Sequence, residues 1–168
     1  MTNLTFASLS EQAAALQRGT VSSQELTRHY LDRIRRLNPR LHAFIDVTEE
    51  AALRLADAAD QRRAAGLPLH PLNGLPIALK DLCDIEGRVT TGGSAAWKTR
   101  KSTCTATIVQ RLLAVGMVVL GKTHMVEFAF GGWGTNPICG TPRNPWDAKA
   151  HRVPGGSSSG SGVAVAGG

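Results

Sequence analysis

Aromatic side chains and cysteines are scarce in this chain of 168 residues. Aromatic residues make up 5% of it, so a hydrophobic core has to be built mainly from Leu, Val, Ile and Ala. The three cysteines, Cys83, Cys104 and Cys139, lie far apart and form no Cys-x-x-Cys pair. An odd number of widely spaced cysteines argues against a disulfide framework and against a zinc site. We therefore expect a reduced, cytoplasmic protein with no metal site and no cofactor.

Long apolar runs and long basic runs are also missing. No apolar run approaches the roughly 20 residues that cross a bilayer, and residues 1–10 have neither the basic region nor the apolar core of a signal peptide. The net charge is +6, but the longest basic run has only three residues within a stretch of four. A nucleic-acid-binding protein usually gathers its charge on one face. We therefore predict no membrane partner and no direct nucleic-acid partner, and interpret these charges as solvated helix surface.

Residues 1–66 have the pattern of a mainly helical region. Residues 8–11 and 22–25 both have the sequence Ser-x-x-Glu, which matches the capping box that opens a helix. Because a residue before proline avoids the helical conformation, we expect the second helix to end at Asn38, before Pro39. The expected elements are a helix that Gly19 terminates, a helix from Ser22 to Asn38, a strand over 42–47 and a helix over 48–65.

Residues 67–168 combine short apolar strands with long loops. The expected elements are a strand over 75–79, a helix over 105–115, a strand over 117–120, a loop over 131–162 and a helix that begins at Ala164. Helical periodicity places apolar side chains on one face of the helix over 48–65 (Ala52, Leu55, Ala56 and Ala59) and of the helix over 105–115 (Ile108, Leu112 and Val115). Helices interleaved with short apolar strands indicate an α/β fold, with a mixed sheet flanked by helices after a helical N-terminal region. We expect residues 1–168 to belong to a single domain.

Lys80 is unusual because it directly follows the apolar strand candidate and precedes Asp81. Burial at the end of a strand disfavours a charged ammonium, and so lowers the pKa of a lysine. A free lysine, with a pKa near ~10.4, is protonated at neutral pH, whereas burial can lower the pKa to roughly 7–8, where the amine can accept a proton. Taken alone, Lys80 is more simply explained by a pair with Asp81 or by contact with solvent.

The segment 154–166 is the second unusual feature, with the sequence Pro-Gly-Gly-Ser-Ser-Ser-Gly-Ser-Gly-Val-Ala-Val-Ala. Glycines allow close approach of the backbone to another group, and serines supply compact hydroxyl groups. The apolar run that follows suggests the start of a buried helix, whose free amides favour negative charge. A flexible linker would have no reason to continue into such a run. The segment therefore predicts a site for an oxyanion, a phosphate or a relay of hydroxyl groups.

Four segments, in this order, resemble the amidase-signature family. They are Gly74–Asp81, Leu120–Thr123 together with Glu127–Ala129, Arg143–Asp147, and the Gly/Ser segment that begins at Pro154. The resemblance implies the fold of that family and hydrolysis of a small-molecule carboxylic amide, to an acid and ammonia or an amine, by a Ser–Ser–Lys relay. The chain is then identified as an N-terminal fragment of such an enzyme. The oligomeric state stays open, with a homodimer among the options.

The resemblance also implies roles for individual residues. Lys80 is expected to be the general base and Ser157 the bridging serine, with a cis peptide bond between Gly156 and Ser157. The residues expected to contact the substrate or to support the loop are Phe130, Gly131, Gly156 and Ser158. In the family, the nucleophilic serine follows in a later Gly-Gly-Ser segment. The 168 residues alone are therefore expected to be inactive.

Three alternatives remain at this stage. Within the family, the chain could belong to the amidase subunit of a tRNA-dependent amidotransferase, which frees ammonia from glutamine for a partner subunit. In another class, Gly116–Thr123 matches the P-loop pattern of nucleotide-binding proteins. Its middle residues are Met, Val, Val and Leu, which resemble a strand rather than a phosphate-binding turn. The third alternative is a fragment with no activity.

Overall fold

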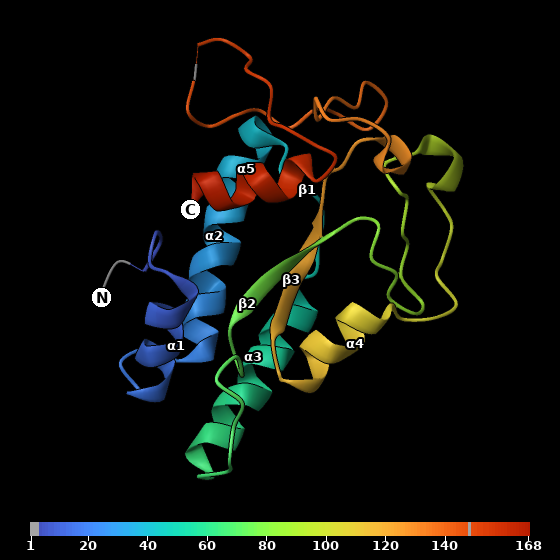
Figure 1. Cartoon of the computed structure of the whole chain (residues 1–168). Coiled ribbons are helices and arrows are strands. Elements are labelled where there is room, and N and C mark those ends of the chain that lie inside the picture. The colour runs from blue at the N-terminus through green and yellow to red at the C-terminus, as the bar shows by residue number, and fades with distance from the viewer. Residues whose placement is uncertain (1–3, 148) are drawn as a thin grey trace.

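The computed structural model describes residues 4–147 and 149–168 as an α/β arrangement, in which a small sheet is packed between helices (Figure 1). The elements are α1 (Leu9–Gln17), α2 (Ser23–Leu41), β1 (Phe44–Val47), α3 (Glu49–Ala64), β2 (Pro76–Lys80), the 3₁₀ helix η1 (Ala95–Trp97), α4 (Thr107–Ala114), β3 (Val118–Thr123), the 3₁₀ helix η2 (Glu127–Ala129) and α5 (Ser159–Gly167). The predicted class, a helical region followed by a mixed sheet with flanking helices, is confirmed.

The sheet has the order β1-β3-β2, so that β3 lies in the centre. β3 runs parallel to β2 and antiparallel to β1, and α4 forms the crossover between the two parallel strands. Lys80, the last residue of β2, is paired with Thr123, the last residue of β3. Because parallel strands end at the same edge of a sheet, the residues that follow β2 and β3 meet there. That edge carries the candidate site.

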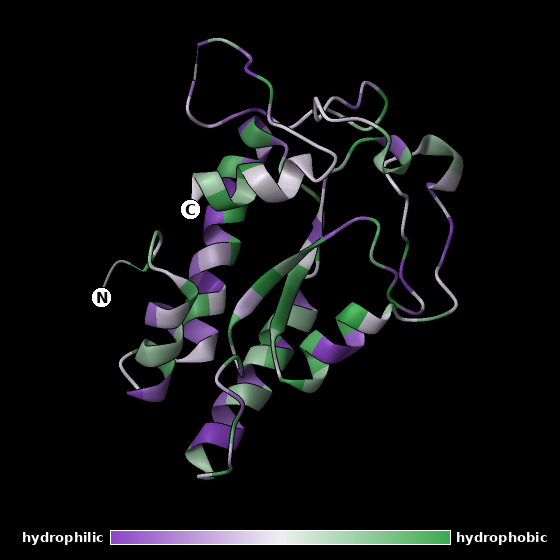
Figure 2. Cartoon of the chain, viewed as in Figure 1, coloured by the Kyte–Doolittle hydropathy of each residue, from purple (hydrophilic) through white to green (hydrophobic). Residues whose placement is uncertain are grey.

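Helices cover both faces of the sheet. Val118 and Leu120 of β3 contribute to a core cluster with α2, α3 and α5, whereas Val119, which lies between them, packs against Val109 of α4. This alternation is the period of two that a strand imposes on its side chains. All six residues of β3 are buried, and Figure 2 shows hydrophobic residues in the central strands and hydrophilic residues along α2 and the far end of α3.

The two helix starts predicted from capping boxes are confirmed, and one predicted helix end is wrong. Ser8 and Ser22 are N-caps with complete capping boxes, and Gly19 takes the left-handed conformation just after α1. α2, however, continues past Pro39 to Leu41. The Asn38 side chain holds this end, because it donates to the Phe44 carbonyl and accepts from the Phe44 amide. These contacts, together with the burial of Leu41 in the core, outweigh the preference that disfavours a helical residue before proline.

One residue on each of two predicted helix faces, and one helix start, also differ from the structure. Leu55 of α3 and Ile108 of α4 are exposed, while the neighbouring residues Ala56 and Val109 are completely buried. The rest of each predicted face is packed as expected, because Ala52, Ala56 and Ala59 of α3 are buried and Leu112 and Val115 pack against a core cluster. α5 begins at Ser159 rather than at Ala164, so the Gly/Ser segment itself forms its first turns. Within the described residues, no helix is both long and apolar enough to cross a membrane.

Candidate functional site

The site is built around Lys80, at the edge where β2 and β3 end. The Lys80 side chain is half-buried, and its Nζ atom lies 2.7 Å from Ser157 Oγ, within hydrogen-bond distance. Burial lowers the pKa of Lys80, and the nearby Cys83 thiol acts in the opposite direction. The two groups that the sequence singled out, 77 residues apart, are therefore in direct contact. A lysine whose ammonium form is disfavoured is suited to accept a proton from this hydroxyl.

Ser157 is held in place by contacts on both sides of it. Its carbonyl accepts a hydrogen bond from the Val126 amide at 3.0 Å, and its peptide bond to Gly156 is cis, as expected. The helix that follows is anchored on β3 and the residue after it, because the Gly160 amide donates to the His124 carbonyl at 2.9 Å. The Ser161 hydroxyl lies 2.8 Å from Thr123 Oγ1. These contacts dock the start of α5 onto the strand that is paired with Lys80.

The backbone of the Gly/Ser segment lies so close to the backbone of residues 131–134 that Gly156 and Gly134 have no room for a side chain. A Cβ atom added at Gly156 would lie 2.8 Å from the Gly134 amide nitrogen and 2.9 Å from the Gly131 carbonyl oxygen. One added at Gly134 would lie 2.2 Å from the Gly155 carbonyl oxygen. Backbone atoms cannot move aside as a flexible side chain can. The two segments thus lie against each other, and their contact fixes the path of the chain into Ser157.

The predicted substrate contacts lie around this edge. Gly131 and Gly156 are neighbours, and both are exposed, as is Ser158. Phe130 is 91% exposed. An apolar cavity of about 410 Å³ lies elsewhere, between α2, the sheet and α5, and is lined by residues such as Leu41, Ala78 and Val165. None of the six predicted site residues lines that cavity, so substrate contact by Phe130, Gly131, Gly156 and Ser158 stays a prediction.

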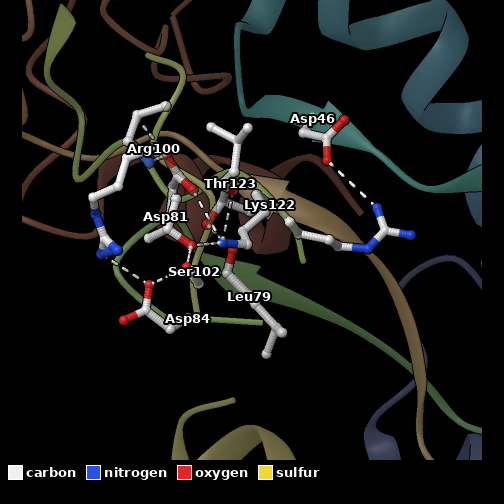
Figure 3. Close-up of polar contacts among 12 residues, drawn as sticks. Asp46, Leu79, Asp81, Asp84, Arg100, Ser102, Lys122 and Thr123 are labelled. Atoms are coloured by element: carbon white, nitrogen blue, oxygen red, sulfur yellow. Dashed lines mark hydrogen bonds and ion pairs between the residues drawn. The ribbon is translucent and has the colours of Figure 1, made fainter. Parts of the chain in front are cut away.

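An ion pair lies beside Lys80 that the sequence did not predict. The side chains of Asp81 and Lys122 are each 2% exposed, and Lys122 Nζ lies 3.3 Å from Asp81 Oδ1. Figure 3 shows the Lys122 amine directed at Asp81. Asp81 is therefore paired with Lys122 and not with Lys80, which rules out a pair with Asp81 as the explanation of Lys80. The sequence signal that could have revealed the pair is a lysine within an apolar strand, which needs a buried partner.

The P-loop interpretation of Gly116–Thr123 is wrong. Residues 118–123 form the central strand of the sheet, rather than a turn whose amides wrap around a phosphate. Lys122 is 1% exposed, and its amine is hydrogen-bonded to Thr90 Oγ1 at 2.6 Å as well as paired with Asp81. It is not accessible to a nucleotide. Among the described residues, no group of three or more His, Cys, Asp or Glu side chains could hold a metal ion.

Comparison with known proteins agrees with this geometry. Residues 25–168 match the family model described as Amidase. The chain is 46% identical over 166 residues to the A subunit of glutamyl-tRNA(Gln) amidotransferase from Salinispora arenicola, covering 99% of this chain and 33% of that protein. It is 49% identical over 160 residues to the protein of the same name from Chromohalobacter salexigens, covering 95% of this chain and 32% of that protein. The chain spans about one third of the length of these curated relatives.

Solved structures with similar folds include a peptide amidase and a cyclic dimer hydrolase. The native peptide amidase from Stenotrophomonas maltophilia superposes with a TM-score of 0.84 at 35% identity, over 96% of this chain and 34% of that one. The structure of 6-aminohexanoate cyclic dimer hydrolase superposes with a TM-score of 0.85 at 31% identity, over 97% of this chain and 32% of that one.

Proposed function

Because the chain belongs to the amidase family, we propose that the protein containing these 168 residues hydrolyses a carboxylic amide to an acid and ammonia or an amine. The observation that carries the proposal is the 2.7 Å contact between Lys80 Nζ and Ser157 Oγ. Its support is chemical: burial disfavours the charged form of Lys80 and lowers its pKa, which favours the amine as a proton acceptor. We further propose that the 168 residues form the N-terminal part of one catalytic domain.

In the proposed mechanism, Lys80 and Ser157 form a proton relay for a nucleophilic serine from outside these residues. Lys80, in its neutral form, accepts the Ser157 proton, and Ser157 accepts the proton of the attacking serine. The new bond from serine oxygen to carbonyl carbon forms as that proton leaves. The relay then returns the proton to the leaving nitrogen as the carbon–nitrogen bond breaks, and water hydrolyses the acyl-serine. Phe130, Gly131, Gly156 and Ser158 are the proposed contacts around the substrate.

A second candidate is narrower, namely that the amide is glutamine and that the ammonia is passed to a partner subunit. The observation that favours it is the name shared by relatives 44–49% identical to this chain, each an A subunit of glutamyl-tRNA(Gln) amidotransferase. The peptide amidase and the cyclic dimer hydrolase described above are 35% and 31% identical to this chain. We also propose a cytoplasmic location, because all three cysteines are free in the structure and free thiols are typical of a reducing compartment.

The first experiment tests the base. The product of the complete gene is assayed for ammonia release from a panel of primary amides that includes glutamine. Lys80→Ala is expected to remove nearly all turnover, while Lys98→Ala, a matched change at an exposed lysine, leaves turnover unchanged. Normal turnover in Lys80→Ala would refute the relay. A preference for glutamine over every other amide supports the second candidate, and turnover of other amides without glutamine rejects it.

The second experiment tests the bridging serine. Ser157→Ala is expected to reduce turnover severely, because the proton path is broken, while Ser10→Ala at the exposed surface has no effect. An acylating reagent directed at reactive serines is then mapped by mass spectrometry. We expect labelling outside residues 1–168. Labelling of Ser157 would show that it is the nucleophile and would overturn its proposed role.

A further inference from the structure

The Asp81–Lys122 pair lies directly behind Lys80. The backbone ladder of β2 continues one residue past its end, because the Asp81 amide donates to the Thr123 carbonyl at 3.1 Å. Successive side chains of a strand point to opposite faces. Lys80 accordingly faces Ser157 on one side, and Asp81 faces Lys122 on the other. Because Asp81 directly follows Lys80 in the chain, a displacement of the Asp81 backbone also displaces Lys80.

The pair also joins three segments of the chain. Lys122 donates to Thr90 Oγ1 at 2.6 Å and to the Val89 carbonyl at 3.3 Å. Asp81 Oδ2 accepts from the amide of Thr91 at 3.0 Å and from its hydroxyl group, and the Asp81 carbonyl accepts from the Gly92 amide at 3.1 Å. The loop 89–92 is therefore fastened to the ends of β2 and β3 through these two side chains.

Stability alone is a weak explanation for such a pair. Desolvation of two charges offsets much of their attraction, and replacing both by apolar residues of similar volume often leaves the stability of the fold unchanged or higher. Removing one partner, in contrast, leaves a buried charge without compensation. If Lys122 were neutral, the Asp81 carboxylate would be an uncompensated negative charge next to Lys80, and a nearby opposite charge favours the protonated form of an amine.

We propose that the Asp81–Lys122 pair is a positioning device for the Lys80 base: it sets the end of β2 so that Lys80 faces Ser157, and it cancels a carboxylate charge that would otherwise hold the Lys80 amine protonated. The inference rests on the proposed function and assigns a role to Lys122 within it. Other titratable groups near the pair are the thiols of Cys83 and Cys139, the Asp84 carboxylate, Arg100 and the His124 imidazole.

The test measures kcat/KM against pH for the product of the complete gene in four forms: wild type, Lys122→Met, Asp81→Asn and the double variant. In Lys122→Met, kcat/KM at neutral pH is expected to fall at least about 10-fold. The rising limb of its pH profile is expected to move to higher pH, because the lone Asp81 carboxylate favours protonated Lys80. Asp81→Asn is expected to shift the limb to lower pH. The double variant, in which neither charge remains, is expected to return the limb to its wild-type position.

Controls separate this inference from the proposed function and from simple unfolding. Lys98→Met removes a positive charge at the exposed surface and is expected to leave the limb in place. Should Lys122→Met fail to fold, Asp81→Asn carries the test, since asparagine keeps an oxygen for the Thr91 amide. If Lys80→Ala is inactive but the limb stays unmoved in the folded pair variants, the inference is overturned while the proposed function stands. If Lys80→Ala is fully active, the proposed function fails as well.

Discussion

Replacing Gly160 by alanine places a methyl group where the backbone next to the sheet already lies. The added Cβ atom would be 2.2 Å from the Ala43 carbonyl oxygen, 2.4 Å from the His124 amide nitrogen and 2.9 Å from the His124 carbonyl oxygen. Gly162, two residues further along α5, offers a matched control, because its nearest neighbour would be the Pro154 carbonyl oxygen at 3.8 Å. The same substitution thus meets rigid backbone at one position and an ordinary contact at the other.

The expected magnitudes follow from these contacts. To accommodate the added methyl group, α5 has to move away from the sheet and lose the hydrogen bond from the Gly160 amide to His124 and that between Ser161 and Thr123. Overpacking costs about 1–3 kcal/mol, and each lost hydrogen bond about 0.5–1.5 kcal/mol, which together give about 2–6 kcal/mol. Gly162→Ala, in contrast, is expected to stabilise the helix by about 0.5–1 kcal/mol. Ser157 would move with α5, and a displacement of 1 Å can reduce turnover about 100-fold.

Urea unfolding and amidase turnover of the complete gene product test this reasoning. Gly160→Ala is expected to lower the unfolding midpoint and turnover together, whereas Gly162→Ala keeps turnover and has an equal or higher midpoint. If Gly160→Ala had the midpoint and turnover of the wild type, α5 would not be packed on β3 as described. If Gly162→Ala were as damaging as Gly160→Ala, the effect would belong to the helix and not to its contact with the sheet.

Three further predictions concern the start of α2, the Gly/Ser segment and one carboxylate. Ser22→Ala removes the hydroxyl that caps α2 and should cost about 1 kcal/mol in urea unfolding, with turnover unchanged; an unchanged midpoint would contradict it. Gly156→Ala brings its Cβ atom 2.8 Å from the Gly134 amide nitrogen and should reduce turnover about 100-fold by displacing the next residue; full turnover would refute the close contact. The hydrogen bond from Ser102 lowers the pKa of Asp84, so this group stabilises the fold above about pH 4, and the stabilisation is lost as the pH falls through its folded pKa. Asp84→Asn should therefore lower the unfolding midpoint at pH 7, and by a smaller amount at acidic pH. A decrease in midpoint that does not depend on pH would contradict this.

Local signals predicted the elements well, because their causes are local. A capping box is complete within four residues, so Ser8 and Ser22 could be identified as helix starts without knowledge of the rest of the fold. The contact between Lys80 and Ser157 was predicted from the resemblance, since nothing within either segment specifies the other. The end of α2 was missed because the Asn38 side chain and the buried Leu41 depend on neighbours that follow the helix.

Residues that depend on packing between distant segments could not be predicted. Leu55 and Ile108 lie on the predicted faces of α3 and α4 but are exposed, because the packing of each helix and not its periodicity alone decides how far the buried face extends. The ion pair of Lys122 was not predicted, since its partner Asp81 lies 41 residues away. Its burial becomes visible only when β2 and β3 are placed side by side.

The most direct test of the central claim is to measure how readily the Lys80 amine reacts at each pH. Only a neutral amine is acetylated by acetic anhydride, so the extent of labelling at Lys80, quantified by mass spectrometry of the folded complete gene product, follows its protonation. We predict half-maximal labelling at a pH below the ordinary lysine value of ~10.4, because burial disfavours the ammonium. Labelling that follows the ordinary value in the folded protein would mean that Lys80 is charged at neutral pH and cannot serve as the base.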